Sequence, residues 1–132
     1  MKRIVLDASA LMSFLENRPG AAKVQELLES AMDGNRQILM SVVNWGEVYY
    51  SVWRAKGPGV AQKVLADISQ LPVQVVDADH LLTQSAAELR AQHKLPYVDC
   101  FAAALAIHLK ADLATSDQDF VHVKKKVKIL WT

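Results

Sequence analysis

Apolar and polar positions follow two kinds of pattern along the chain. Short apolar runs rich in β-branched residues predict buried strands, and apolar residues three or four positions apart predict helices. Residues that start or stop helices separate these stretches, such as Ser41 and the segment 57–59. The pattern predicts strands at 3–6, 37–40, 73–76, 112–115 and 127–130, and helices at 8–15, 19–32, 42–56, 60–71, 80–93 and 96–110, the fifth capped by Asp77 or Asp79.

The alternation of strands and helices predicts the fold class. Strands separated by helices pair in parallel through right-handed crossovers, which gives an α/β sandwich. The chain has 132 residues, of which 52% are apolar. This length and composition predict one globular domain that can bury a core without disulfides or other cross-links.

The cysteine content indicates a cellular location, whereas the overall charge does not indicate a partner. The chain has 15 Lys and Arg against 14 Asp and Glu, which neither requires nor excludes a nucleic-acid partner. A single cysteine, Cys100, cannot form an internal disulfide and suits a reducing cytoplasm. Asp7 and Glu16 interrupt the apolar N-terminus too early for a signal peptide, and no apolar run approaches the roughly 20 residues of a membrane span. We expect a cytoplasmic protein with no membrane partner.

Four acidic residues lie in apolar surroundings. Asp7 and Asp117 each follow a predicted strand, Asp99 precedes the apolar segment 100–109, and Glu47 lies mid-helix among aromatic residues. Burying a lone carboxylate is unfavourable, so four such residues suggest a shared partner. Oxygen-only ligands select hard ions, which favours Mg²⁺ or Mn²⁺ over zinc.

Each of these acids also has a purely structural interpretation. Asp7 fits a helix N-cap, Asp117 fits the cap of a short turn, and Asp99 lies where a helix dipole favours negative charge. Glu47 fits the polar face of an amphipathic helix. In an open parallel sheet the ligand site lies beyond the carboxyl ends of the strands, where Asp7 and Asp117 fall. Spacing alone does not place Asp99 or Glu47 there.

Other chemistries fit the sequence poorly. A haloacid-type phosphatase needs a second aspartate two residues after Asp7, where Ser9 stands. A receiver domain needs adjacent acids near the end of its first strand, and no glycine fingerprint for a dinucleotide follows any strand. The histidines lack paired ligand spacing; they are His80, His93, His108 and His122.

Four segments carry a resemblance to a known family when taken in order: Val5-Leu6-Asp7-Ala8-Ser9, Asn44-Trp45-Gly46-Glu47, Tyr97 to Ala106 and Leu113 to Phe120. With these segments the chain resembles the PIN domain family, and within it the small VapC-type ribonuclease toxins of bacterial toxin–antitoxin pairs. The resemblance covers essentially the whole chain and implies a single PIN domain over residues 1–132. It also implies a three-layer α/β/α sandwich with a parallel sheet of about five strands.

The resemblance further implies an activity and its partners. It implies a metal-dependent endoribonuclease, the toxin of a type II toxin–antitoxin pair, with a cognate antitoxin protein as partner and homodimerisation. The alternative is a catalytically inactive PIN-like module that only binds RNA or a protein. The acids carried over as catalytic residues and as ligands of Mg²⁺, or alternatively Mn²⁺, are Asp7, Glu47, Asp99 and Asp117. Ser9 and Thr115 match small hydroxyl positions beside that site, and Asp119 matches a frequent extra acid.

Basic residues are candidates for contact with RNA phosphates. Arg54, Lys56 and Lys63 flank the predicted 57–59 turn, and further lysines lie in the segment 124–128. Phosphate contacts of this kind would make RNA binding weaken with salt. The lysine segment has a second interpretation, as the charged protection of an exposed edge strand.

Aromatic residues lie four positions apart on the helix predicted at 42–56. Trp45, Tyr49 and Trp53 therefore share one face of that helix. This face either packs into the core or forms an exposed apolar groove for an antitoxin helix.

Overall fold

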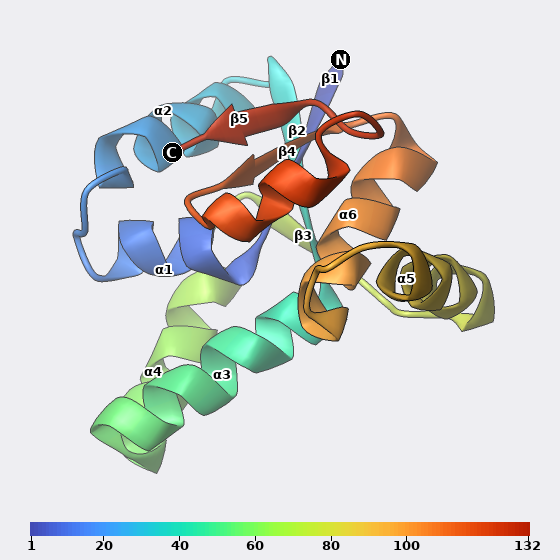
Figure 1. The fold of residues 1–132 in the computed structure, drawn as a ribbon. Helices are drawn as coiled ribbons and strands as arrows, with labels where there is room; N and C mark the ends of the chain where they lie inside the picture. Colours follow the sequence, from blue (N-terminus) through green and yellow to red (C-terminus); the bar gives the residue numbers. More distant parts are fainter.

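The computed structural model describes all 132 residues and contains one sheet of five parallel strands (Figure 1), in the order β3-β2-β1-β4-β5. The strands are β1 (Lys2–Leu6), β2 (Arg36–Ser41), β3 (Val73–Val76), β4 (Asp112–Thr115) and β5 (Ile129–Trp131). The helices are α1 (Ala8–Leu15), α2 (Ala21–Met32), α3 (Val42–Lys56), α4 (Pro58–Ser69), α5 (His80–Gln92) and α6 (Tyr97–Leu109), and a 3-10 helix, η1 (Gln118–Val123), follows β4. None of the helices combines the length and apolar character that crossing a bilayer requires.

The sheet separates two hydrophobic cores. Successive residues of the central strand β1 point to opposite faces. Ile4 and Leu6 pack with α1, α2, α3 and α4, whereas Val5 packs with α5, α6 and η1. All three side chains are fully buried. Helices on both faces of a parallel sheet confirm the predicted α/β/α sandwich (Figure 1).

The strand order determines where a ligand can bind. The connections from β1 to β2 and from β2 to β3 proceed towards one edge of the sheet, and the connection from β3 to β4 returns to the other side of β1. This reversal makes β1 and β4 neighbours, with Leu6 in register with Ala114. In open α/β sheets, ligands bind beyond the carboxyl ends of strands at such a reversal. Asp7 and Asp117 follow these two strand ends.

Two helices begin near the same edge of the sheet. α3 starts directly after β2, with Ser41 as its N-cap, so Glu47 lies in its second turn, about 8 Å along the helix axis. α6 leads into the amino end of β4, so its first turn, which contains Asp99, lies towards the carboxyl edge. The topology therefore supplies the placement that spacing alone left open.

Three of the predicted starts are wrong by two residues. α2 begins at Ala21 rather than at 19, because Gly20, with a φ of 97°, forms its N-cap. α4 begins at Pro58 rather than at 60, since proline suits the first helical position. β5 begins at Ile129, so residues 124–126 lie in turns and do not protect an edge strand.

Candidate metal centre

Asp7 follows β1 and caps α1, and hydrogen-bond donors enclose its carboxylate. Only 2% of Asp7 is exposed. Its Oδ1 accepts from the backbone N of Ala10 at 2.9 Å, and its Oδ2 accepts from Thr115 Oγ1 at 2.6 Å. Ser9 Oγ lies 2.8 and 2.9 Å from the two carboxylate oxygens. The N-cap interpretation of Asp7 is confirmed, and both predicted hydroxyl residues contact this acid.

Thr115 links the segment after β1 to the segment after β4. Its side chain is fully buried, and its Oγ1 donates to Asp7 while it accepts from the backbone N of Asp117 at 2.9 Å. Ser9 Oγ accepts from the backbone N of Ser116 at 3.2 Å. The residues after β1 and those after β4 thus form one hydrogen-bonded unit, which fixes the start of the Asp117 loop.

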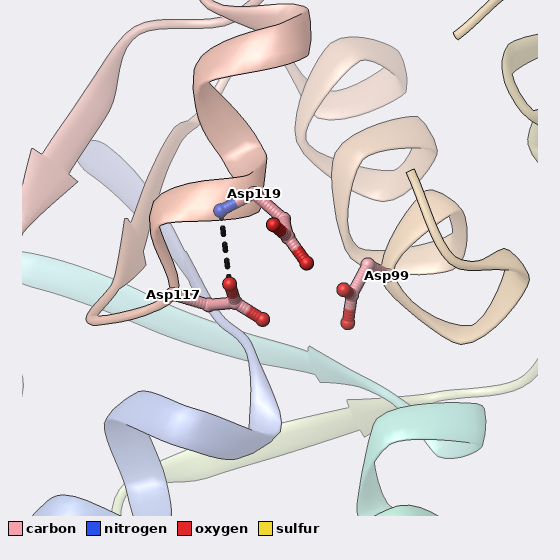
Figure 2. A group of neighbouring side chains, drawn as sticks. All are labelled: Asp99, Asp117 and Asp119. Carbon is pink, nitrogen blue, oxygen red and sulfur yellow. Dashed lines mark hydrogen bonds between the residues drawn. The ribbon is translucent and has the colours of Figure 1, made fainter. Parts of the chain in front are cut away.

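Three aspartates place carboxylate oxygens around a common point (Figure 2). Asp117 caps η1, and its Oδ1 accepts from the backbone N of Asp119 at 2.9 Å. Asp99 approaches from the first turn of α6 and is 8% exposed. One oxygen from each of Asp99, Asp117 and Asp119 lies within 4.8 Å of the others. Asp119 is exposed, so the group opens to solvent on its side.

The negative charges of the predicted site act on Asp99. Its pKa is raised from 3.8 to about 7, first by burial and then by the charges of Asp117, Glu47, Asp7 and Asp119. Of the four acids that the sequence singled out, the structure brings Asp99 and Asp117 together, and Asp119 joins them. Asp7 and Glu47 lie outside this group, and their charges still disfavour a negative charge on Asp99.

Burial also dominates at the two remaining acids. The pKa of Asp7 is raised to about 6 by burial, an effect that its hydrogen bonds, foremost the one from Thr115, partly offset. The pKa of Glu47 is raised by burial and by the charge of Asp117, and is lowered by a hydrogen bond from Asn44. Both acids are therefore easier to protonate than an exposed carboxylate.

The donor set fits a hard divalent cation. Oxygen ligands of Mg²⁺ lie at about 2.1 Å, so two ligands on opposite sides of the ion stand about 4.2 Å apart. The three aspartate oxygens, within 4.8 Å of one another, need only a small closure to share one ion. No histidine or cysteine belongs to this group, in agreement with the preference for Mg²⁺ or Mn²⁺ over zinc.

Three of the six predicted RNA-contacting lysines form ion pairs within the chain. Lys56 lies 3.7 Å from Glu16, Lys63 pairs with Asp67 on its own helix, and Lys128 lies 3.9 Å from Asp112. The three lysine side chains are more than half exposed, so they remain accessible to phosphate. Contact between these residues and RNA stays a prediction.

One polar residue beside the site escaped the sequence analysis. Asn44 is fully buried, and its side-chain amide lies 3.4 Å from Glu47 Oε1 and 3.2 Å from the carbonyl oxygen of Val98. Sequence reasoning used Asn44 only as part of a motif. The available signal was its position three residues before Glu47, which puts both side chains on one helix face.

Fold and site together define a class of protein: a parallel α/β domain with a carboxylate cluster at the carboxyl edge of its central strands. The chain belongs to the PIN domain family, whose model matches residues 4–126. A comparison with curated proteins finds no match.

Several solved structures share this fold. The chain is 18% identical to a chain of VapBC2 from Rickettsia felis, solved with a promoter DNA fragment, with a TM-score of 0.78 and 98% of each chain covered. It is 16% identical to a chain of DNA-bound VapBC from Salmonella typhimurium (TM-score 0.73, 98% of each chain). It is 19% identical to Mycobacterium tuberculosis VapC20, described as a toxin that cleaves the sarcin–ricin loop (TM-score 0.70, 89% of this chain and 92% of that chain). At identities this low, the structural similarity establishes a common fold and nothing finer.

Proposed function

We propose that this protein is a metal-dependent endoribonuclease, a single PIN domain that acts as the toxin of a toxin–antitoxin pair. The observation that carries the proposal is the approach of Asp99, Asp117 and Asp119 within 4.8 Å, inside the charge field of Asp7 and Glu47. Structural roles for single acids do not explain this convergence, because like charges brought together in a partly buried place destabilise a fold. A cation removes that penalty.

Asp99 and Asp117 would hold the ion, with Asp119 available on the solvent side and Asp7 and Glu47 completing the acidic site. Asp7 Oδ2 accepts from Thr115, whose Oγ1 also accepts from the backbone of Asp117. Asp7 therefore fixes Asp117 as well as contributing negative charge. A bound divalent cation supplies a Lewis acid that lowers the pKa of water and offsets the charge that develops on phosphate.

Glu47 and the basic residues would then have separate roles. Glu47 is half-buried and accepts a hydrogen bond from Asn44, which suits a carboxylate that helps to hold the ion. Arg54 and the lysines singled out in the sequence would contact the phosphates on either side of the scissile bond. No serine–histidine or cysteine–histidine nucleophile is required, because water activated by the ion would attack the phosphate. Cys100 is unsuited to that role, because it is buried and burial raises its pKa to about 11.

An antitoxin partner is supported by structures that share the fold, among them a toxin–antitoxin complex from Klebsiella pneumoniae and VapBC-5 from Mycobacterium tuberculosis, a member of a family of toxin–antitoxin systems. The aromatic face of α3 suits such a partner. Trp45 and Tyr49 are half-buried against the core, whereas Tyr50 and Trp53 are 48% and 46% exposed. A surface hollow of about 480 Å³ is lined by Tyr49, Tyr50, Trp53 and Arg54, and the Arg54 guanidinium lies 5.9 Å from the Tyr50 ring centroid. We propose that an antitoxin segment packs here and that the toxin forms a homodimer.

The proposal is tested by incubating the purified protein with total cellular RNA, with and without Mg²⁺, and mapping new RNA ends by sequencing. We expect discrete new ends only with Mg²⁺ or Mn²⁺, and none with the Asp99→Asn variant. Asp33→Asn, which removes an exposed aspartate at the end of α2, is the matched control and should cleave normally. Full cleavage by folded Asp99→Asn would refute the assignment. RNA binding without cleavage by the wild-type protein would favour the inactive binding module.

A further inference from the structure

Asn44 links α3 and α6, the helices that carry Glu47 and Asp99. It lies in the first turn of α3, three residues before Glu47. Its Nδ2 lies 3.4 Å from Glu47 Oε1 and 3.2 Å from the carbonyl oxygen of Val98. That carbonyl belongs to the peptide bond that joins Val98 to Asp99. One amide group therefore contacts both the Glu47 carboxylate and the backbone that carries Asp99.

Stability alone does not explain an asparagine at this position. The side chain is fully buried, and its Oδ1 is buried without any hydrogen-bond partner. A buried polar atom without a partner destabilises the folded state, and such atoms in native proteins call for a specific explanation. Exchanging Oδ1 and Nδ2 of the side-chain amide would not give the oxygen a donor, because the oxygen would then face both the Glu47 carboxylate and the Val98 carbonyl. The contacts that Nδ2 makes fix the orientation.

We propose that Asn44 is a positioning residue that holds the Glu47 carboxylate towards Asp99 so that both acids serve one metal site. The inference rests on the proposed function. Glu47 is only half-buried, so its side chain has room to turn towards solvent, and the charge of Asp117 repels it from the site. The amide hydrogens of Asn44 oppose this movement by donating to Glu47. Its second contact, to Val98, holds α3 and α6 at the spacing that the two acids need.

The test measures Mn²⁺ affinity directly by isothermal titration calorimetry, independently of RNA cleavage. Loss of a group that orients a metal ligand weakens metal binding by about tenfold or more. We expect this weakening for Asn44→Ala and a smaller one for Asn44→Ser, which keeps one donor and serves as the second variant if alanine prevents folding. Ser41→Ala is the matched control, because Ser41 is equally buried and caps the same helix through Val43 but contacts no acid. It should lower thermal stability without changing Mn²⁺ affinity.

A double-mutant comparison separates positioning from general loosening of the fold. If Asn44 acts through Glu47, then Asn44→Ala should not weaken Mn²⁺ binding further in a Glu47→Ala background. Unchanged affinity in folded Asn44→Ala or Asn44→Ser, equal weakening in the Glu47→Ala background, or the same weakening in Ser41→Ala would overturn the inference while leaving the proposed nuclease intact. Failure of the wild-type protein to bind Mn²⁺ would overturn the metal site and the inference together.

Discussion

Replacing Asp99 by asparagine should stabilise the metal-free protein at alkaline pH, although it removes the proposed activity. Asp99 has a raised pKa in the folded protein, because burial and the surrounding acids disfavour its charged form. Asparagine has nearly the same shape and no charge. The substitution therefore relieves the repulsion among the acids without leaving a cavity.

The sign follows from the two pKa values of Asp99. The folded value is about 7 and the ordinary value is 3.8, so the folded protein binds the proton more tightly than the unfolded chain. The contribution of Asp99 to stability is fully present below pH 3.8 and is lost as the pH rises through about 7. Relative to the wild-type protein, Asp99→Asn should therefore gain stability as the pH rises from 5 to 8.

The size of the effect can be bounded. A difference of about three pKa units corresponds to about 4 kcal/mol. The group is open to solvent at Asp119, and part of the change occurs below pH 5, so we expect a relative gain of about 1 to 2 kcal/mol. For a domain of this size, this raises the melting temperature by roughly 3 to 8 °C.

The assay is thermal and urea unfolding in EDTA at pH 5 and pH 8, with tryptophan fluorescence and circular dichroism as the measured signals. Asp33→Asn controls for the loss of one negative charge at an exposed position. Adding Mg²⁺ at pH 8 should stabilise the wild-type protein much more than Asp99→Asn. A stability difference between Asp99→Asn and wild type that is the same at both pH values would refute the reasoning, because it would mean that Asp99 is not strained by its surroundings.

Further predictions concern the metal, the hydroxyl network and the backbone. Exhaustive chelation with EDTA should stop RNA cleavage and Mg²⁺ or Mn²⁺ should restore it; cleavage that survives chelation would remove the metal mechanism. Thr115→Val should lower the free energy of unfolding by about 1 to 3 kcal/mol and reduce cleavage, because Asp7 Oδ2 and the Asp117 backbone N both lose their partner; a melting temperature equal to wild type would contradict this. Gly20→Ala should destabilise the protein by at least about 1 kcal/mol, because Gly20 has a φ of 97° and an added Cβ would lie 2.8 Å from the carbonyl carbon of Thr132. Circular dichroism melting tests it, and an unchanged melting temperature would show that the end of the chain moves aside.

Much of the fold follows from local signals. Ser41 as N-cap fixes the start of α3, and the apolar runs after Lys2 and Arg36 give adjacent parallel strands because the intervening segment is helical. The exact start of α4 was missed because both glycines at 57–59 suggested a break, whereas only Gly57, with a φ of 89°, leaves the helical conformation. Proline and the second glycine fit the first turn.

The convergence of the acids was only partly predictable. Asp7 and Asp117 follow strands, so their common edge could be derived from the sequence. The positions of Glu47 and Asp99 could also have been derived, because helices that connect parallel strands run back across the sheet and the helix before a strand starts at the opposite edge. What the sequence could not supply was the strand order that makes β1 and β4 neighbours, since this depends on long-range packing. The contact of Asn44 with Val98 was also beyond the sequence, because it joins residues 54 positions apart.

The pairing of β1 with β4 also sets when the site can exist during biosynthesis. The ribosome makes Asp7 early, and Thr115 and Asp117 only after more than a hundred further residues. A nascent chain that has not yet produced β4 has neither the hydroxyl that encloses Asp7 nor the aspartate that faces Asp99. For a nuclease, this order means that the acidic site cannot form until translation has passed Asp117.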